Sequence, residues 1–118
     1  MQYMLLIYSE EGAIEKMAPN EMAGLMGAFG AFTEALASSG SMVNADRLQP
    51  VANATTVRAP GGAVQIHDGP FAETKEQLGG YYLIEAPDLD AALTWAKKCP
   101  AVGYGAVEVR PVFVMPQG

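Results

Sequence analysis

One short run, from His67 to Phe71, holds the side chains of this sequence that are best suited to acid–base chemistry. His67 is the only histidine of the chain, and imidazole is the side chain whose ordinary pKa lies nearest neutrality. Asp68 follows it directly, but adjacent residues of a strand point to opposite faces, so the two converge only if a turn begins at Asp68. We treat Asp68 and His67 as a candidate catalytic pair. The alternative is an ordinary turn beside a surface histidine.

Charged residues after this turn are candidate ligand contacts. Glu73, Lys75 and Glu76 form a polar stretch that ends shortly before Gly79 and Gly80. A glycine pair can act as a hinge, or it can let a ligand approach the backbone closely. We therefore expect either a lid over a site, with Glu73 and Lys75 as ligand contacts, or solvated charges with a weak ion pair.

Two further candidates lie on predicted strands. Tyr81 and Tyr82 face opposite ways, so one is expected in the core, and the other, for which we take Tyr81, is free to line a cavity. Arg110 lies on the last predicted strand. Its guanidinium suits a structural ion pair with Glu108 or Glu85, or the binding of a carboxylate or phosphate.

The single cysteine, Cys99, excludes an intrachain disulfide and favours a reducing compartment. It follows the C-terminus of a predicted helix, where the helix dipole disfavours a thiolate, so we do not expect a nucleophile there. With one histidine and one cysteine we expect no transition-metal site. No P-loop, dinucleotide or GxSxG motif is present, and we predict no cofactor.

Composition indicates one folded domain over residues 1–118, because 50% of the residues are hydrophobic and 17% are charged. The net charge of −6 argues against a nucleic-acid or anionic membrane partner, which needs clustered Lys and Arg. No run approaches the ~20 apolar residues that span a bilayer, and the apolar start reads as a strand without signal-peptide features. We therefore expect a cytoplasmic protein.

Apolar periodicity predicts the elements that must position these side chains. A helix is predicted over Glu21–Ser39, with Asn20 as its N-cap, and a second over Leu89–Lys98, with Asp88 as its N-cap. Pro60-Gly61-Gly62 is typical of a hairpin turn. Strands are predicted at Gln2–Tyr8, Ser41–Ala45, Thr55–Ala59, Ala63–His67, Gly80–Ala86 and Ala106–Val114.

This order of elements predicts an α+β fold of the ferredoxin-like split βαβ type with an inserted β-hairpin. Both helices are expected on one face of an antiparallel sheet. The first strand is apolar on both faces, so the other face of the sheet also needs a cover. A second copy of the chain is the commonest cover, and we predict a face-to-face homodimer.

The run from Asp68 to Glu85, DGPFAETKEQLGGYYLIE, resembles the signature of the DGPF-domain branch of the YCII-related family. The opening MQYMLLIY, the segment AFTEALASSG and the closing AALTWAKKCPAVGYGAVEVRPV resemble the same family, so the resemblance covers nearly the whole chain. It implies the dimeric α+β barrel fold. Relatives in that superfamily include small monooxygenases, lactone isomerases and haem-binding enzymes, so the fold does not fix the chemistry.

The better-known YCII branch has a histidine on its first helix that is proposed to work with an aspartate. Here Phe29 lies near that place and no histidine lies between Asn20 and Gly40, so the pair does not transfer. The first hypothesis is therefore a small-molecule enzyme with a cavity bordered by Asp68, His67 and Glu73. The alternatives are a non-catalytic ligand-binding or regulatory dimer module, since some YCII-related domains occur beside alternative sigma factors, and a purely structural dimer.

Overall fold

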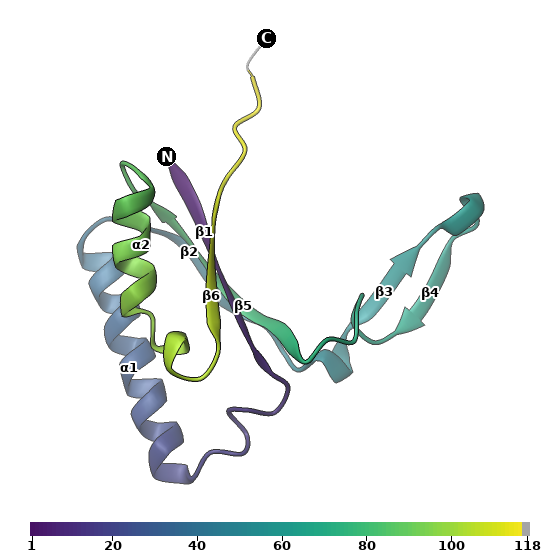
Figure 1. The fold of residues 1–118 in the computed structure, drawn as a ribbon, viewed down its shortest axis with the longest axis horizontal. Coiled ribbons are helices and arrows are strands. Elements are labelled where there is room, and N and C mark those ends of the chain that lie inside the picture. The colour runs from purple at the N-terminus through teal and green to yellow at the C-terminus, as the bar shows by residue number, and fades with distance from the viewer. Residues whose placement is uncertain (117–118) are drawn as a thin grey trace.

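A computed structural model describes residues 1–116 of the chain as a four-stranded antiparallel sheet, two helices and a separate two-stranded arm (Figure 1). The order of strands in the sheet is β2-β5-β1-β6, and the arm is β3-β4. The predicted α+β, ferredoxin-like split βαβ fold with an inserted hairpin is confirmed. The elements are β1 (Gln2–Glu10), α1 (Pro19–Ser38), β2 (Met42–Arg47), β3 (Thr55–Arg58), β4 (Gln65–Asp68), β5 (Glu76–Glu85), α2 (Leu89–Lys98) and β6 (Ala106–Pro111).

The core lies between the helices and one face of the sheet. Alternate residues of β1 are buried there because successive side chains of a strand point to opposite faces. Phe32 and Leu36 of α1 and Ala92 and Ala96 of α2 pack against this face. The buried side chains of the central strands are Tyr3, Leu5, Ile7, Tyr82 and Ile84.

Most predicted strands differ from the structure by one or two residues at an end, and β5 begins at Glu76, four residues before the predicted Gly80. Two further differences have a clear local cause. Helix α1 begins at Pro19 rather than after Asn20, and Ala18 at its N-cap makes no side-chain hydrogen bond. Proline suits the first helical position because its φ is already helical and its missing N–H would have no partner there. Strand β6 ends at Pro111, short of Val114, because its partner β1 begins at Gln2, whose carbonyl accepts from Val112 N at 2.9 Å and is the last group of β1 that the strand can pair with.

Helix α2 begins as its sequence predicts. Asp88 is the N-cap, and its carboxylate accepts a hydrogen bond of 2.9 Å from the backbone N–H of Ala91. We expect Asp88→Ala to lower the free energy of unfolding by about 0.5–2 kcal/mol, because one N–H of the first turn loses its partner. Urea denaturation measures this loss. Asp88→Asn is the control, since asparagine caps equally well, and equal losses in both variants would contradict the assignment.

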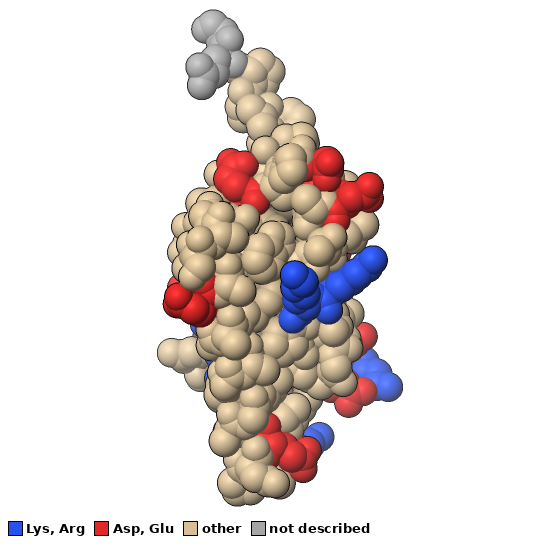
Figure 2. Space-filling view, turned by 90° about the vertical axis from the view of Figure 1, so that its left-hand side faces the viewer, with Lys and Arg blue, Asp and Glu red and all other residues tan. Residues whose placement is uncertain are grey.

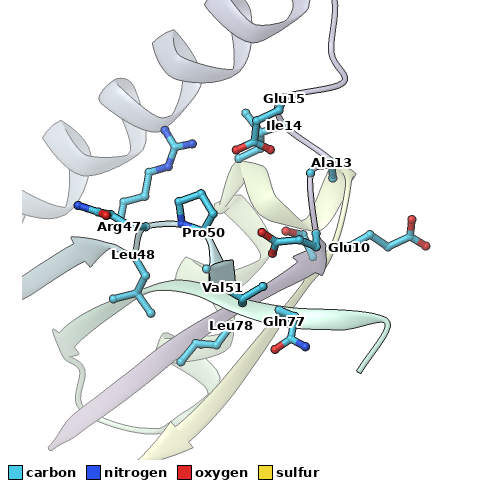
Figure 3. A pocket seen from close by; sticks show the side chains of 15 residues that line it. Glu10, Ala13, Ile14, Glu15, Arg47, Leu48, Pro50, Val51, Gln77 and Leu78 are labelled. Atoms are coloured by element: carbon cyan, nitrogen blue, oxygen red, sulfur yellow. The ribbon is translucent and has the colours of Figure 1, made fainter. Parts of the chain in front are cut away.

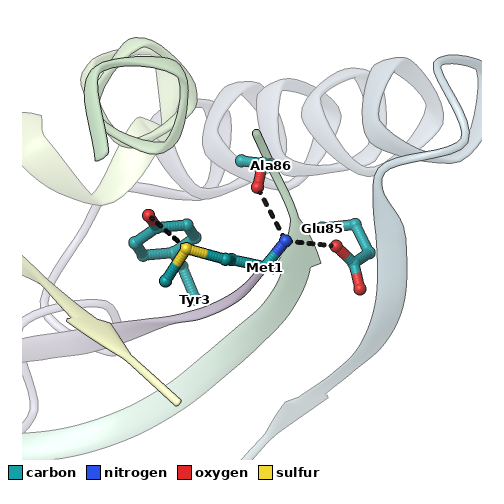
Figure 4. Close-up of polar contacts among 4 residues, drawn as sticks. All are labelled: Met1, Tyr3, Glu85 and Ala86. Atoms are coloured by element: carbon teal, nitrogen blue, oxygen red, sulfur yellow. Dashed lines mark hydrogen bonds and ion pairs between the residues drawn. The ribbon is translucent and has the colours of Figure 1, made fainter. Parts of the chain in front are cut away.

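The first residue ties β1 to the end of β5 (Figure 4). The ammonium group of Met1 donates to the carboxylate of Glu85 at 3.0 Å and to the carbonyl of Ala86 at 3.1 Å. The hydroxyl of Tyr3 donates to the sulfur of Met1 at 3.8 Å. The charged groups are more than half exposed, so this ion pair stabilises the fold by less than about 1 kcal/mol.

The arm projects from the sheet on the side opposite the helices (Figure 1). Its two strands run antiparallel and are joined by a turn in which Gly61 and Gly62 have positive φ values of 66° and 91°. Only glycine adopts these values without strain. None of the helices within residues 1–116 has the length and apolar character of a membrane span.

Candidate functional site

The structure places His67 and Asp68 on the arm, where both are exposed. Strand β4 includes Asp68, which pairs with Thr55, while His67 pairs with Thr56. The turn therefore starts only at Gly69, and the two side chains point to opposite faces of the ribbon. Neither side chain lines the cavity between α1 and the sheet, the cavity that adjoins it, or the hollow at the base of the arm. The structure does not bring the two together.

Three other predicted contacts also lie outside a shared pocket. Glu73 and Lys75 are exposed between the arm and β5, and Lys75 Nζ lies 3.3 Å from a carboxylate oxygen of Glu10. Arg110, on β6, donates to Glu108 through both Nε, at 2.8 Å, and Nη2. This hydrogen-bonded ion pair raises the pKa of Arg110. The structure thus shows the structural ion pair that was one of the two options for Arg110.

A cavity of about 320 Å³ lies between α1 and the sheet, and we call it the helix–sheet cavity. This volume falls at the lower end of the range for small-molecule sites. The cavity is mostly apolar and aromatic. Its walls include Ile7, Ile14, Met26, Phe29, Tyr82 and Tyr104.

Tyr82 presents a fixed phenol to this cavity. Its position on β5 places it on the helix side of the sheet, where its hydroxyl lies 2.9 Å from the Thr33 hydroxyl of α1. The ring of Phe32 packs against it edge to face, with centroids 5.1 Å apart. Burial raises the pKa of Tyr82 and also that of Tyr104. Both phenols are therefore protonated near neutral pH and can donate hydrogen bonds.

Arg47 lies at the rim of the helix–sheet cavity. It is the last residue of β2, pairs with Gly80, and is exposed. Its Nη1 lies 4.0 Å from the sulfur of Met26, and within residues 1–116 no carboxylate lies within ion-pair distance of it. An unpaired guanidinium beside apolar walls can hold a carboxylate or another anionic oxygen group in bidentate geometry.

A second cavity of about 310 Å³ adjoins the first (Figure 3). Arg47, Ser9, Ile14 and Gly79 line both. Figure 3 shows Arg47 extending from the end of β2 toward α1, with Glu15 also at this cavity. Arg47 thus lies at the boundary between an apolar cavity and a more polar one.

Tyr81 lines the helix–sheet cavity, but its hydroxyl is engaged elsewhere. It donates to Asp46 at 2.7 Å and accepts from the side-chain amide of Asn44 at 2.9 Å. The hydrogen bond to Asp46 raises the pKa of Tyr81. Tyr81 and Asp46 thus form a pair that supports the edge of the sheet, and the Asp46 carboxylate is already occupied.

Sequence reasoning missed Arg47, because it follows a short predicted strand and carries no motif. Its role depends on the absence of a nearby carboxylate, which only the folded chain reveals.

On the helix side of the molecule, charged side chains lie in small groups on a largely uncharged surface (Figure 2). Among residues 1–116, no group of three or more His, Cys, Asp or Glu side chains is placed to hold a metal ion.

Comparison with known proteins settles the family. The family model of the YCII-related domain matches residues 1–116. The chain belongs to the YCII-related family. An uncharacterized protein from Rhizobium meliloti (strain 1021) is 35% identical to this YCII-related chain over 120 residues, which cover 100% of this chain and 97% of the relative.

A solved structure shows the same fold. It is a 5-chloro-2-hydroxyhydroquinone dehydrochlorinase from Burkholderia phenoliruptrix AC1100 in complex with 2,5-dihydroxybenzoquinone, and the TM-score is 0.56. The alignment covers 96% of this chain and 94% of that chain at 16% sequence identity, so the likeness is one of fold alone. The two chains share an α+β fold in which two helices cover one face of an antiparallel sheet. Fold and family together permit a small-molecule enzyme.

Proposed function

We propose that this YCII-related protein binds a small apolar molecule with one anionic group in the helix–sheet cavity. The observation that carries the proposal is the unpaired guanidinium of Arg47 at the rim of an apolar cavity of small-molecule size. Aromatic and aliphatic walls favour the apolar part of such a ligand, while Arg47 fixes its anionic end and its orientation. Arg47 is therefore proposed as the specificity anchor.

Two neutral phenols add chemistry to this site. Tyr82 and Tyr104 line the same cavity, and both are protonated near neutral pH because burial raises a phenol pKa that is ordinarily already about 10. A protonated phenol in a partly dry cavity can donate a hydrogen bond to an oxygen on which negative charge develops, or act as a general acid. This arrangement supports acid-assisted chemistry on an oxygen-bearing substrate.

A catalytic cycle also needs a proton acceptor, and the carboxylate of Asp46 is already bonded to Tyr81. His67 and Asp68 each stay proposed for an acid–base role, but singly, because they point to opposite faces of the arm, and Glu73 and Lys75 stay proposed ligand contacts. Since these residues are exposed on the arm or beside it, they could join a site only where the arm meets another molecule. We propose a homodimer for this reason, and a cytoplasmic location because the one cysteine, Cys99, is free.

The second candidate function is a non-catalytic ligand-binding or regulatory module. The engaged Asp46 favours it, because the helix–sheet cavity then offers hydrogen-bond donors and an anion anchor without a free base. The two functions differ in one measurement. An enzyme converts the bound molecule and loses turnover in His67→Ala while binding persists, whereas a regulatory module binds the molecule unchanged.

A thermal-shift comparison of benzoate with benzamide tests the binding proposal. The two have nearly the same shape and differ in charge, so we expect benzoate to raise the melting temperature of the wild type more than benzamide does. Arg47→Gln should weaken benzoate binding about 10- to 100-fold, because a charge-assisted hydrogen bond to the anion is lost. The melting shift at a fixed benzoate concentration reports this loss.

Arg58→Gln is the matched control, since it removes the same charge from the arm, where Arg58 lies over the ring of Phe71 at 5.1 Å. This variant should bind benzoate as the wild type does. Equal stabilisation by benzoate and benzamide, equal losses in the two variants, or no stabilisation by either compound would each count against Arg47 as an anion anchor.

A further inference from the structure

The β3–β4 arm has an apolar face that the rest of the described chain does not cover. Val57 pairs with Ile66 across the two strands, so both side chains lie on one face of the ribbon. Val57 is 62% exposed and Ile66 is 69% exposed. The next pair, Arg58 and Gln65, lies on the other face, while Thr55 and Asp68 at the base of the arm share the face of Val57 and Ile66. This alternation is typical of strands that pack one face against another surface.

The arm makes few contacts that would hold it in place within its own chain. It forms a separate sheet, and neither strand pairs with the four-stranded sheet. At its base Gly69 N donates to Ala54 O at 2.7 Å, and the Thr56 hydroxyl donates to Gly69 O at 2.7 Å. These hydrogen bonds join the arm to its own base. Because an isolated two-stranded ribbon is marginally stable in water, the arm needs an outside surface.

The face of the sheet that the helices leave open is on the same side as the arm (Figure 1). Strand alternation puts Met4, Leu6 and Leu83 on this open face, and all three are only partly buried. A hollow of about 670 Å³ connects the sheet with the base of the arm and is lined by, among others, Tyr8 of β1 and Phe71. Apolar side chains therefore continue from the open face to the arm.

One partner suits both surfaces. Two copies related by a twofold axis can bury both the projecting ribbon and the open face of the sheet, because the axis places each arm against the other copy. Charge permits this contact: residues 51–72 contain Arg58 and Asp68 as their only Lys, Arg, Asp or Glu, a net charge of zero, while the whole chain carries −6. An uncharged arm can approach an acidic copy without strong repulsion, unlike contact between two acidic surfaces.

We propose that the β3–β4 arm packs Val57 and Ile66 against a second copy of this chain. The inference rests on the homodimer proposed above and names the arm as a contact that holds it together. In such a dimer His67, on the opposite face of the ribbon from Ile66, is carried to the partner while its side chain faces away from the packed surface. The arm thus determines where the only imidazole of the chain lies.

Sedimentation velocity over a range of protein concentrations tests this proposal on the full chain. Ile66→Asp should raise the dimer dissociation constant at least about tenfold, because a charge replaces an apolar side chain that becomes buried on association. Gln65→Asp is the matched control: it adds the same charge at the neighbouring residue, on the other face of the ribbon. It should change the constant far less. Circular dichroism checks that both variants fold.

Hydrogen exchange gives a second readout. Backbone amides of β3 and β4 should exchange slowly when the wild type is dimeric and quickly after dilution below the dissociation constant. A dimer that Ile66→Asp and Gln65→Asp weaken equally, or not at all, would overturn the arm contact and leave the homodimer standing. A wild type that stays monomeric at every concentration would overturn both, while benzoate binding tests the cavity separately.

Discussion

Gly105→Ala is expected to lower the free energy of unfolding by about 3 kcal/mol or more, a large fraction of the roughly 5–15 kcal/mol that stabilises a typical domain. A Cβ atom on Gly105 would lie 2.1 Å from the backbone oxygen of Tyr8 and 3.1 Å from Cβ of Ser9. The Tyr8 oxygen belongs to β1, so no side-chain rotation can relieve the clash. The chain would have to separate β6 from β1 where Ala106 pairs with Tyr8. Urea denaturation followed by circular dichroism measures the loss.

Gly103→Ala is the matched control for this prediction. It lies two residues earlier, and a Cβ atom there would meet no heavy atom within 4 Å. We expect a change within about 0.5 kcal/mol, as for other surface substitutions. If the two variants had similar stabilities, the close approach of β1 to the start of β6 would be contradicted.

Leu36→Ala is the second substitution with a large expected effect, a loss of about 2–5 kcal/mol. Leu36 lies on α1, is 0% exposed, and belongs to the same buried cluster as Leu5 and Ile84. Truncation removes apolar contacts and leaves a cavity that the surrounding helices and sheet can fill only in part. Thermal and urea unfolding of the variant both report the effect.

The control for Leu36→Ala is Leu89→Ala, the same chemical change on the first residue of α2. Leu89 is 47% exposed, so we expect a much smaller loss. Comparable losses at the two leucines would show that α1 does not pack over the sheet as described. The same helix supplies Met26, Phe29 and Thr33 to the helix–sheet cavity, so its packing also supports the site.

Much of the fold could be predicted because local and tertiary preferences agree. The two-sided apolar pattern of Gln2–Tyr8 belongs to a strand with helices on one face and an open, partly buried face on the other. Asp88 caps α2 as its residue type suggests. The predicted start of α1 was wrong because Asn20 and Pro19 are both typical of helix starts. The helix begins with Pro19 at its first position, where proline is favoured.

The site was harder to predict because its residues are recognisable by surroundings and not by type. Arg47 differs from Arg110 in having no ion-pair partner within the described residues, and no sequence pattern distinguishes them. Tyr82 fits the prediction of a core residue, but its side chain also lines the helix–sheet cavity. Conversely, His67 and Asp68 were chosen for their chemistry, but their location on an exposed arm follows from tertiary structure alone.

The two proposals divide the molecule between binding and assembly. The helix–sheet cavity lies on the side of the sheet covered by the helices, whereas the arm projects on the other side. Arg47→Gln and Ile66→Asp should therefore have separable effects, the first on benzoate binding and the second on dimer dissociation. Effects of distant, independent sites are generally additive, so the double variant should show both.

Methyl NMR spectra of protein labelled at isoleucine and methionine test the central claim most directly. On titration with benzoate, we predict that the methyl signals of Ile7, Ile14 and Met26, which line the helix–sheet cavity, shift and saturate together. The signal of Ile66 should not shift, because benzoate in the cavity does not contact the arm. Saturating shifts at Ile66 with none at the three cavity residues, or no shifts at any methyl group, would contradict a ligand site between α1 and the sheet.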